Sequence, residues 1–73
     1  MKIKVYLNII GRNIQIRRKQ LTMSQQELAD ATNLPKITIQ HIEEAKISAS
    51  VLTLMSISIA LEINLSELLK IKK

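Results

Sequence analysis

The sequence contains no cysteine, tryptophan or phenylalanine, and it has one tyrosine, one glycine and one proline in 73 residues. Without cysteine, disulfide bonds, cysteine-ligated zinc sites and cysteine nucleophiles are excluded. With a single histidine as well, we expect no metal site and no cofactor. The shortage of glycine and proline disfavours the many tight turns of a β-sheet protein and favours helices joined by short loops.

The lack of aromatic residues also argues against a surface that stacks single-stranded nucleic-acid bases. No apolar run approaches the ~18 residues that a membrane-spanning helix needs, so we expect no membrane partner. Two lysines precede a short apolar stretch near the N-terminus, but Asn8 interrupts that stretch and no small-residue cleavage site follows it. The pattern therefore argues against a signal peptide and favours a cytoplasmic protein.

Apolar residues make up 47% of the chain, which is typical of a folded domain, and 73 residues suffice for one domain, 1–73. The net charge is +5, from 11 basic and 6 acidic residues. A basic balance favours a polyanionic partner such as nucleic acid, although solubility alone also explains it. The chain is too short for a large catalytic pocket and lacks a nucleophile–base pair. We expect neither an enzyme nor a small-molecule substrate.

Residues that begin helices recur along the chain. Ser24 and Glu27 have the spacing of a capping box, in which each side chain bonds the other's backbone amide. Pro35 suits the start of the next helix, where no amide is required. Residues 51–61 fit the alternation of a strand as well as a helix, and we favour the helix. The sequence predicts an all-α domain whose five helices cover residues 7–21, 24–32, 36–45, 51–61 and 65–69.

The two ends of the chain carry weaker signals. Residues 2–6 alternate between polar and apolar side chains, as a short half-buried strand does. We expect residues 1–7 to form a short extended N-terminal arm, which is either frayed or pairs as an edge strand with a second subunit. Residues 70–73 form a basic tail.

Two short helices joined by a three-residue turn, within residues 24–45, have the pattern of a helix-turn-helix. Its second helix needs a polar side that enters the DNA major groove and an apolar side that rests on the scaffold. Ile39 and Ile42 provide the apolar side. Gln25, at the start of the first of the two helices, lies where its amide reaches a phosphate. The outward positions, each of which alone also fits a solvated helix surface, are Lys36, Ile37, Gln40, His41 and Glu44.

Residues 10–69 resemble the lambda-repressor-like helix-turn-helix proteins of the Xre or Cro/C1 type. The resemblance implies a compact five-helix domain that binds duplex DNA, usually as a two-fold dimer, and controls transcription in a bacterium, phage or plasmid. Each motif alone is weak, but their joint spacing holds without a gap. The residues that match the family's motifs are Arg18, Ser24-Gln25-Gln26-Glu27-Leu28-Ala29, Ile39, Ile42-Glu43, Leu54, Ile57, Leu61, Leu65, Leu68 and Leu69.

The resemblance also implies roles for individual residues. Gln25 corresponds to a phosphate-contacting glutamine, and we expect Ser24 and Lys46 to contact phosphates as well. Arg18 and Glu43 correspond to a structural ion pair that does not touch DNA. The positions that correspond to readers of base edges are Lys36, Ile37, Thr38, Gln40 and His41.

Four positions depart from the family's pattern. Ala45 stands where a glycine usually ends the recognition helix, and an L-residue in the left-handed conformation costs ~1 kcal/mol or more. We therefore expect this helix to continue past Ala45. Glu62 replaces a second glycine, Pro35 replaces a Ser or Thr cap, and Ala49 replaces a proline. These changes concern the loop shapes more than the fold.

The fourth helix holds more apolar residues than an inward stripe needs, and such a surplus favours an interface. We expect a homodimer through the fourth and fifth helices that reads a near-palindromic operator and acts as a repressor-like, nucleoid-associated transcription regulator. The surplus also fits a fuller core in a chain without large aromatics. A protein-interaction module, such as an antitoxin or anti-repressor, is the alternative function. The expected interface residues are Leu52, Met55, Ile59 and Ile63.

Overall fold

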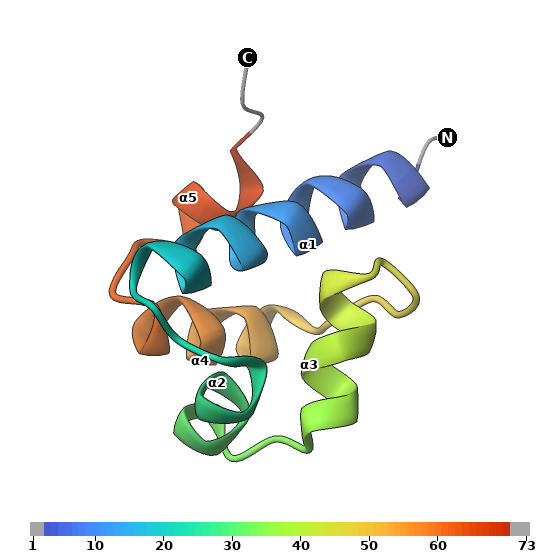
Figure 1. Cartoon of the computed structure of the whole chain (residues 1–73). Helices are drawn as coiled ribbons and strands as arrows, with labels where there is room; N and C mark the ends of the chain where they lie inside the picture. The colour runs from blue at the N-terminus through green and yellow to red at the C-terminus, as the bar shows by residue number, and fades with distance from the viewer. Residues whose placement is uncertain (1–2, 71–73) are drawn as a thin grey trace.

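The computed structural model describes residues 3–70, which form five helices and, within that range, no strand. The helices are α1 (Ile3–Gln20), α2 (Gln25–Thr32), α3 (Lys36–Glu43), α4 (Val51–Ala60) and α5 (Leu65–Leu69). In the view of Figure 1, α1 and α5 lie at the top and α2 at the bottom, with α3 at the right and α4 between them. The expected all-α, five-helix fold is confirmed.

The core is aliphatic, and every helix contributes to it. Ile14 of α1, Leu28 of α2, Ile39 of α3, Ile57 of α4 and Leu68 of α5 are each at most 1% exposed. Burying one such side chain stabilises the folded state by roughly 1.5–3 kcal/mol. Because this core has no large aromatic ring to fill gaps, its stability depends on close packing between these branched side chains.

Polar residues fix the beginnings of α2 and α4. The Ser24 hydroxyl accepts from the Glu27 amide at 3.0 Å, and the Glu27 carboxylate accepts from the Ser24 amide at 2.8 Å, which completes the predicted capping box. The Ser50 hydroxyl accepts from the Thr53 amide at 3.1 Å. Pro35 precedes α3 without a side-chain cap. The backbone conformation of Pro35, and not a side-chain hydrogen bond, therefore begins α3.

The expected extended arm is wrong for residues 3–7, because these residues form the first turns of α1. Ile3, Leu7 and Ile10 follow one another at intervals of four and three residues and lead into the buried Ile14. A helix therefore keeps them on one face, whereas a strand would separate them. Residues 1–2 of the arm, and residues 71–73 of the predicted basic tail, lie outside the described part of the chain.

The end of α3 also differs from the sequence-based expectation. The helix ends at Glu43, and Ala45 adopts the left-handed conformation with φ 61°, so the prediction that it continues past Ala45 is wrong. The Lys46 amide donates to the His41 carbonyl at 2.9 Å, and the Ala45 amide donates to the Ile42 carbonyl at 3.2 Å. These two bonds satisfy carbonyls at the helix end and offset the strain at Ala45.

The end of α4 repeats this geometry. Glu62 has φ 59°, and the amides of Glu62 and Ile63 donate to the carbonyls of Ile59 and Ser58 at 3.1 and 3.0 Å. The family's two glycine positions thus keep the left-handed conformation here without glycine. The loop after each helix retains its tight shape at the cost of local backbone strain.

Candidate nucleic-acid interface

Helix α3 separates into a packed side and an accessible side. Ile39 and Ile42 are 1% and 3% exposed, whereas Ile37 is 53% exposed. This division is the one that a helix entering a DNA groove requires. Of the remaining predicted base-contacting residues, Lys36 is exposed, and Thr38, Gln40 and His41 are half-buried.

The predicted phosphate-contacting residues lie in different local environments. Lys46 is exposed in the loop after α3, and Ser24 is exposed at the beginning of α2. The Ser24 hydroxyl is already committed to the capping box. Gln25 is half-buried, and its Nε2 atom donates to Oε1 of Glu43 at 3.0 Å. An amide nitrogen carries two hydrogens, so Gln25 retains one donor for a further acceptor.

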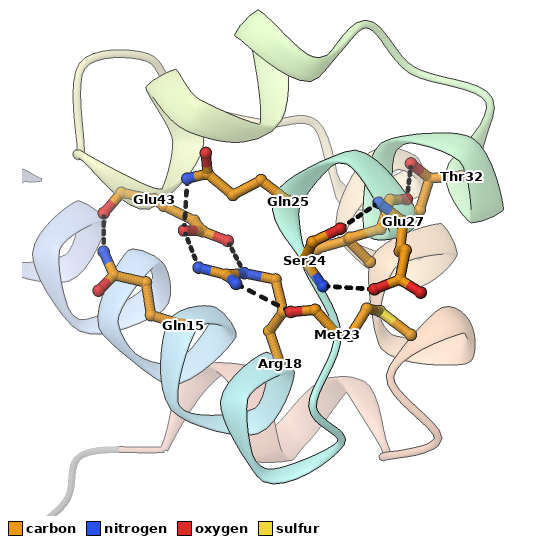
Figure 2. A network of polar contacts seen from close by, with 9 residues as sticks. Gln15, Arg18, Met23, Ser24, Gln25, Glu27, Thr32 and Glu43 are labelled. Carbon is orange, nitrogen blue, oxygen red and sulfur yellow. Dashed lines mark hydrogen bonds and ion pairs between the residues drawn. The ribbon is translucent and has the colours of Figure 1, made fainter.

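Arg18 and Glu43 form a bidentate ion pair that joins α1 to α3 (Figure 2). Arg18 Nε lies 2.8 Å from Glu43 Oε2, and Arg18 Nη2 lies 3.0 Å from Glu43 Oε1. Their side chains are 12% and 1% exposed. A third guanidinium nitrogen donates to the Met23 carbonyl at 2.9 Å, so the arginine also fixes the turn before α2. The pair positions α3 from behind and does not belong to its accessible side.

Gly11 permits the close crossing of α1 and α3, and sequence reasoning did not single it out. A β-carbon built on Gly11 would lie 2.5 Å from the Glu43 carbonyl oxygen and 2.8 Å from that of Ile42. Gln15, one turn further along α1, donates from Nε2 to the Glu43 carbonyl at 3.2 Å. Because the chain has a single glycine and it lies inside a helix, its position is the one feature of the sequence that could have indicated a close helix crossing here. Together Gly11, Gln15, Arg18 and Glu43 form what is termed here the α1–α3 joint.

Two further polar residues of α1 hold the ends of other helices and were also missed. Asn13 is 5% exposed, and its Nδ2 atom donates to the carbonyls of Leu68 and Lys70 at 2.8 and 2.9 Å. Arg17 donates from Nε to the Leu61 carbonyl at 2.9 Å. These bonds satisfy carbonyls that the ends of α5 and α4 leave free. Helix α1 thus organises the whole domain and not only α3.

Glu44 places an acidic group at the end of the accessible side of α3. Lys46 Nζ lies 3.1 Å from Glu44 Oε1. The hydrogen bond from Lys46, with its positive charge, lowers the pKa of Glu44 below its usual value. Lys46 therefore places a positive charge directly beside the negative charge of Glu44.

The outer side of α4 is exposed and wholly uncharged. Val51 and Leu52 are 64% and 77% exposed, Met55 is 43% exposed and Ile59 is 75% exposed. These four residues form what is termed the α4 apolar face. Ile63, the fourth predicted interface residue, is partly buried against the core. The structure thus leaves three of the four predicted interface residues exposed.

The described part of the chain offers no obvious metal site: residues 3–70 contain no group of three or more His, Asp or Glu residues placed to bind an ion. None of the helices in this range is both long and apolar enough to span a membrane.

The two short helices, their tight turn and the half-packed α3 together define a helix-turn-helix (Figure 1). The model of the family HTH_3, described as helix-turn-helix, matches residues 14–68. The chain belongs to this helix-turn-helix family. The family comprises lambda-repressor-like DNA-binding transcription regulators, so the resemblance noted from the sequence motifs is confirmed. No curated protein matches the chain.

Three solved structures share the fold of this chain. The restriction-modification controller protein C.AhdI from Aeromonas hydrophila has a TM-score of 0.83 and 24% identity, over 85% of this chain and 94% of that one. The hypothetical transcription factor NHTF from Neisseria has a TM-score of 0.87 and 20% identity, over 89% and 75%. An HTH_3 family transcriptional regulator from Vibrio cholerae has a TM-score of 0.84 and 25% identity, over 89% and 36%.

Proposed function

We propose that the protein is a sequence-specific DNA-binding regulator that acts as a homodimer on a near-palindromic operator. The observation that carries the proposal is the division of α3, where Ile37 is 53% exposed while Ile39 is 1% exposed. A packed inner side fixes the helix, and an accessible outer side leaves its residues available to base edges. The proposed function is binding and not catalysis.

The side chains on the accessible side of α3 suggest which bases they read. Gln40 carries the donor and acceptor that match N7 and N6 of adenine. Lys36, in the first turn, is suited to O6 and N7 of guanine or to a phosphate. Ile37 offers apolar contact that suits a thymine methyl group. Thr38 and His41 flank these positions and complete the proposed reading surface.

The amino end of α2 is the proposed anchor on the phosphate backbone. Free backbone amides and the positive end of the helix dipole favour an anion there. Gln25 would donate its second amide hydrogen to a phosphate while the first remains on Glu43. Ser24 would contact the same strand, and Lys46 would contact a phosphate beyond the other end of α3.

The α4 apolar face supports the proposal of a homodimer with a second copy of this chain. The net charge of +5 makes two copies repel each other unless they meet through an uncharged surface. Helix α4 carries no charged residue along its ten positions. A two-fold dimer brings the same patch of both copies together, which an apolar face allows without pairing like charges. Leu52, Met55 and Ile59 would form its centre, with Ile63 at its edge.

A dimer would also allow the protein to contact both halves of a near-palindromic operator. One α3 helix covers only a half-site, and two such helices related by a two-fold axis read half-sites about 34 Å apart. An operator occupied in this way is closed to other proteins, so we propose a repressor-like role in association with the nucleoid.

The alternative role, a protein-interaction module such as an antitoxin or anti-repressor, would favour an acidic or neutral outer side of α3. Glu44 is the acidic group that points to it. Lys46 pairs with Glu44 at 3.1 Å, and the exposed Lys36 adds a positive charge at the start of α3. The charges on this side of α3 therefore favour a polyanionic partner.

The test is selection of duplexes from a random pool with three proteins: the wild type, Gln40→Ala and Lys36→Ala. The Gln40 variant should relax the preference at one base position in each half-site, at ~1–3 kcal/mol of discrimination. The Lys36 variant should relax another position, or weaken all sequences equally if it meets only phosphate. Selected sites without two-fold symmetry would contradict the dimer. Unchanged profiles for both variants would contradict the role of α3.

A further inference from the structure

A row of polar residues runs along the first turns of α1, outside the segment that matches the family. Lys4, Asn8 and Arg12 follow one another at intervals of four residues, so they lie along one face of the helix. All three are exposed. The family match begins at residue 14, and thus none of the three belongs to it.

Two residues of this row, Asn8 and Arg12, border the recognition helix α3 in space. Asn8 and Arg12 line an open groove together with Gln15 of α1 and with Glu43 and Glu44 at the far end of α3. At Gly11 the two helices cross at contact distance, with the backbone of Ile42 and Glu43 on the α3 side. A phosphate strand that passes the far end of α3 would therefore also meet the first turns of α1.

Arg12 is a basic residue of the groove whose charge is not paired with either of the groove's acidic residues. Glu43 is paired with Arg18 and Glu44 with Lys46. Within residues 3–70, neither Arg12 nor Lys4 forms an ion pair or a side-chain hydrogen bond. Both acidic groups in the groove thus already have a basic partner, and two cations of α1 remain available to an anion.

We propose that Lys4, Asn8 and Arg12 form a flanking-phosphate site, which binds backbone phosphates of duplex DNA beside the groove that α3 reads. The site rests on the proposed function and extends it: the site contributes affinity without sequence preference. Arg12, which lines the groove, makes the main contact through its guanidinium. Asn8 donates a hydrogen bond, and Lys4 contributes charge one turn further out.

The experiment measures affinity for a selected operator and for a scrambled duplex, by fluorescence anisotropy at 50–200 mM salt, for the wild type and Arg12→Gln. The matched control is Lys19→Gln, which removes one exposed charge from the other end of α1, outside the groove. Glutamine is a good helix former, so both variants should keep α1 intact, and circular dichroism checks this.

For Arg12→Gln we expect an equal loss of affinity for both duplexes and a slope of log affinity against log salt that is reduced by about 0.9 per bound subunit. For each bound subunit, that change in slope corresponds to a wild-type advantage that shrinks about 3.5-fold between 50 and 200 mM salt. Lys19→Gln should leave the slope unchanged. An operator shortened to end at the half-sites should abolish the difference between wild type and Arg12→Gln.

Three results would overturn the flanking-phosphate site: an unchanged slope for Arg12→Gln, an equal change for Lys19→Gln, or an Arg12→Gln effect that is confined to the operator. In each case intact operator binding by the wild type would leave the proposed function standing. If the wild type binds no duplex at all, the proposed function and the flanking-phosphate site both fail.

Discussion

The α1–α3 joint and the α4 apolar face are built on opposite principles. The joint is buried and specific: a bidentate ion pair, a glycine contact and a glutamine fix one relative position of two helices. The α4 apolar face is exposed and unspecific, with four aliphatic side chains and no hydrogen-bonding group to set a register. The comparison teaches that this small domain fixes the position of α3 with specific buried contacts, whereas the outer side of α4 is an exposed apolar surface without such contacts.

The sharpest way to break the joint is Glu43→Ala. It leaves the Arg18 guanidinium buried without its carboxylate and removes the acceptor of Gln25. We expect a loss of about 3–5 kcal/mol in the free energy of unfolding. Urea denaturation followed by circular dichroism measures it. The neighbouring Glu44→Ala is the control and should leave the midpoint unchanged.

Adding Arg18→Met to Glu43→Ala should recover much of that loss, because no unpaired charge then remains in the interior. Two single losses that simply add in the double variant would show that the pair is not coupled. A wild-type midpoint for Glu43→Ala would contradict the structural role of the joint.

Gly11→Ala tests the contact between α1 and α3 and should have the next largest effect on the free energy of unfolding. Alanine favours a helix by ~1 kcal/mol over glycine, but here its β-carbon would lie 2.5 Å from a backbone oxygen of α3. We expect a net loss of about 1–3 kcal/mol in the free energy of unfolding, typical of overpacking. Asn8→Ala, at an exposed position of the same helix, should cost nothing. Stabilisation by Gly11→Ala would mean that α1 and α3 lie further apart in solution.

Glu62→Gly tests the strained end of α4 and should stabilise the protein. Glycine adopts the φ of 59° found at this position without a β-carbon penalty. We expect a gain of roughly 1 kcal/mol in the free energy of unfolding, measured in urea. Glu62→Ala keeps the strain and removes the same side chain, so it should give no gain. Equal effects of the two variants would assign the change to the lost carboxylate.

Ile59→Lys places a charge on the α4 apolar face and should have the smallest effect on the unfolding of a subunit, about 0.5 kcal/mol or less. The side chain is 75% exposed, so the core does not need it. Light scattering should instead show a shift from dimer to monomer, with weaker operator binding. Ala31→Lys adds the same charge at an exposed position of α2, outside the proposed interface, and should leave the dimer intact. A dimeric Ile59→Lys would contradict association through α4.

The sequence predicts most of what is local in this fold. Ser24 and Glu27 mark the start of α2 through their spacing alone, and Pro35 marks the start of α3. The alternation of residues 2–6 led to the wrong prediction of an extended arm. Five positions are too few to distinguish a strand from a helix, and the apolar stripe of the helix becomes clear only when it is followed to Ile14. Ala45 misled for another reason: the hydrogen bonds donated by the amides of Ala45 itself and Lys46 outweigh the intrinsic preference of alanine against the left-handed conformation.

The parts of the candidate interface that depend on distant contacts could not be predicted. Asn13 bonds carbonyls 55 and 57 positions away, and Arg17 bonds one that is 44 positions away. A backbone carbonyl leaves no signature in the sequence, so no pattern of residue types locates such a bond. The same holds for Gly11, whose role depends on what crosses it. The outward positions of α3 were predictable because helical spacing alone determines them.

Tyr6 is the one tyrosine in a chain without tryptophan or phenylalanine, and it is 55% exposed near the start of α1. Intrinsic fluorescence and near-ultraviolet absorption therefore originate from a single point, two residues from Lys4 and Asn8. The aliphatic interior is optically silent. A change in the emission of this protein therefore reports on the surroundings of Tyr6, near the beginning of α1.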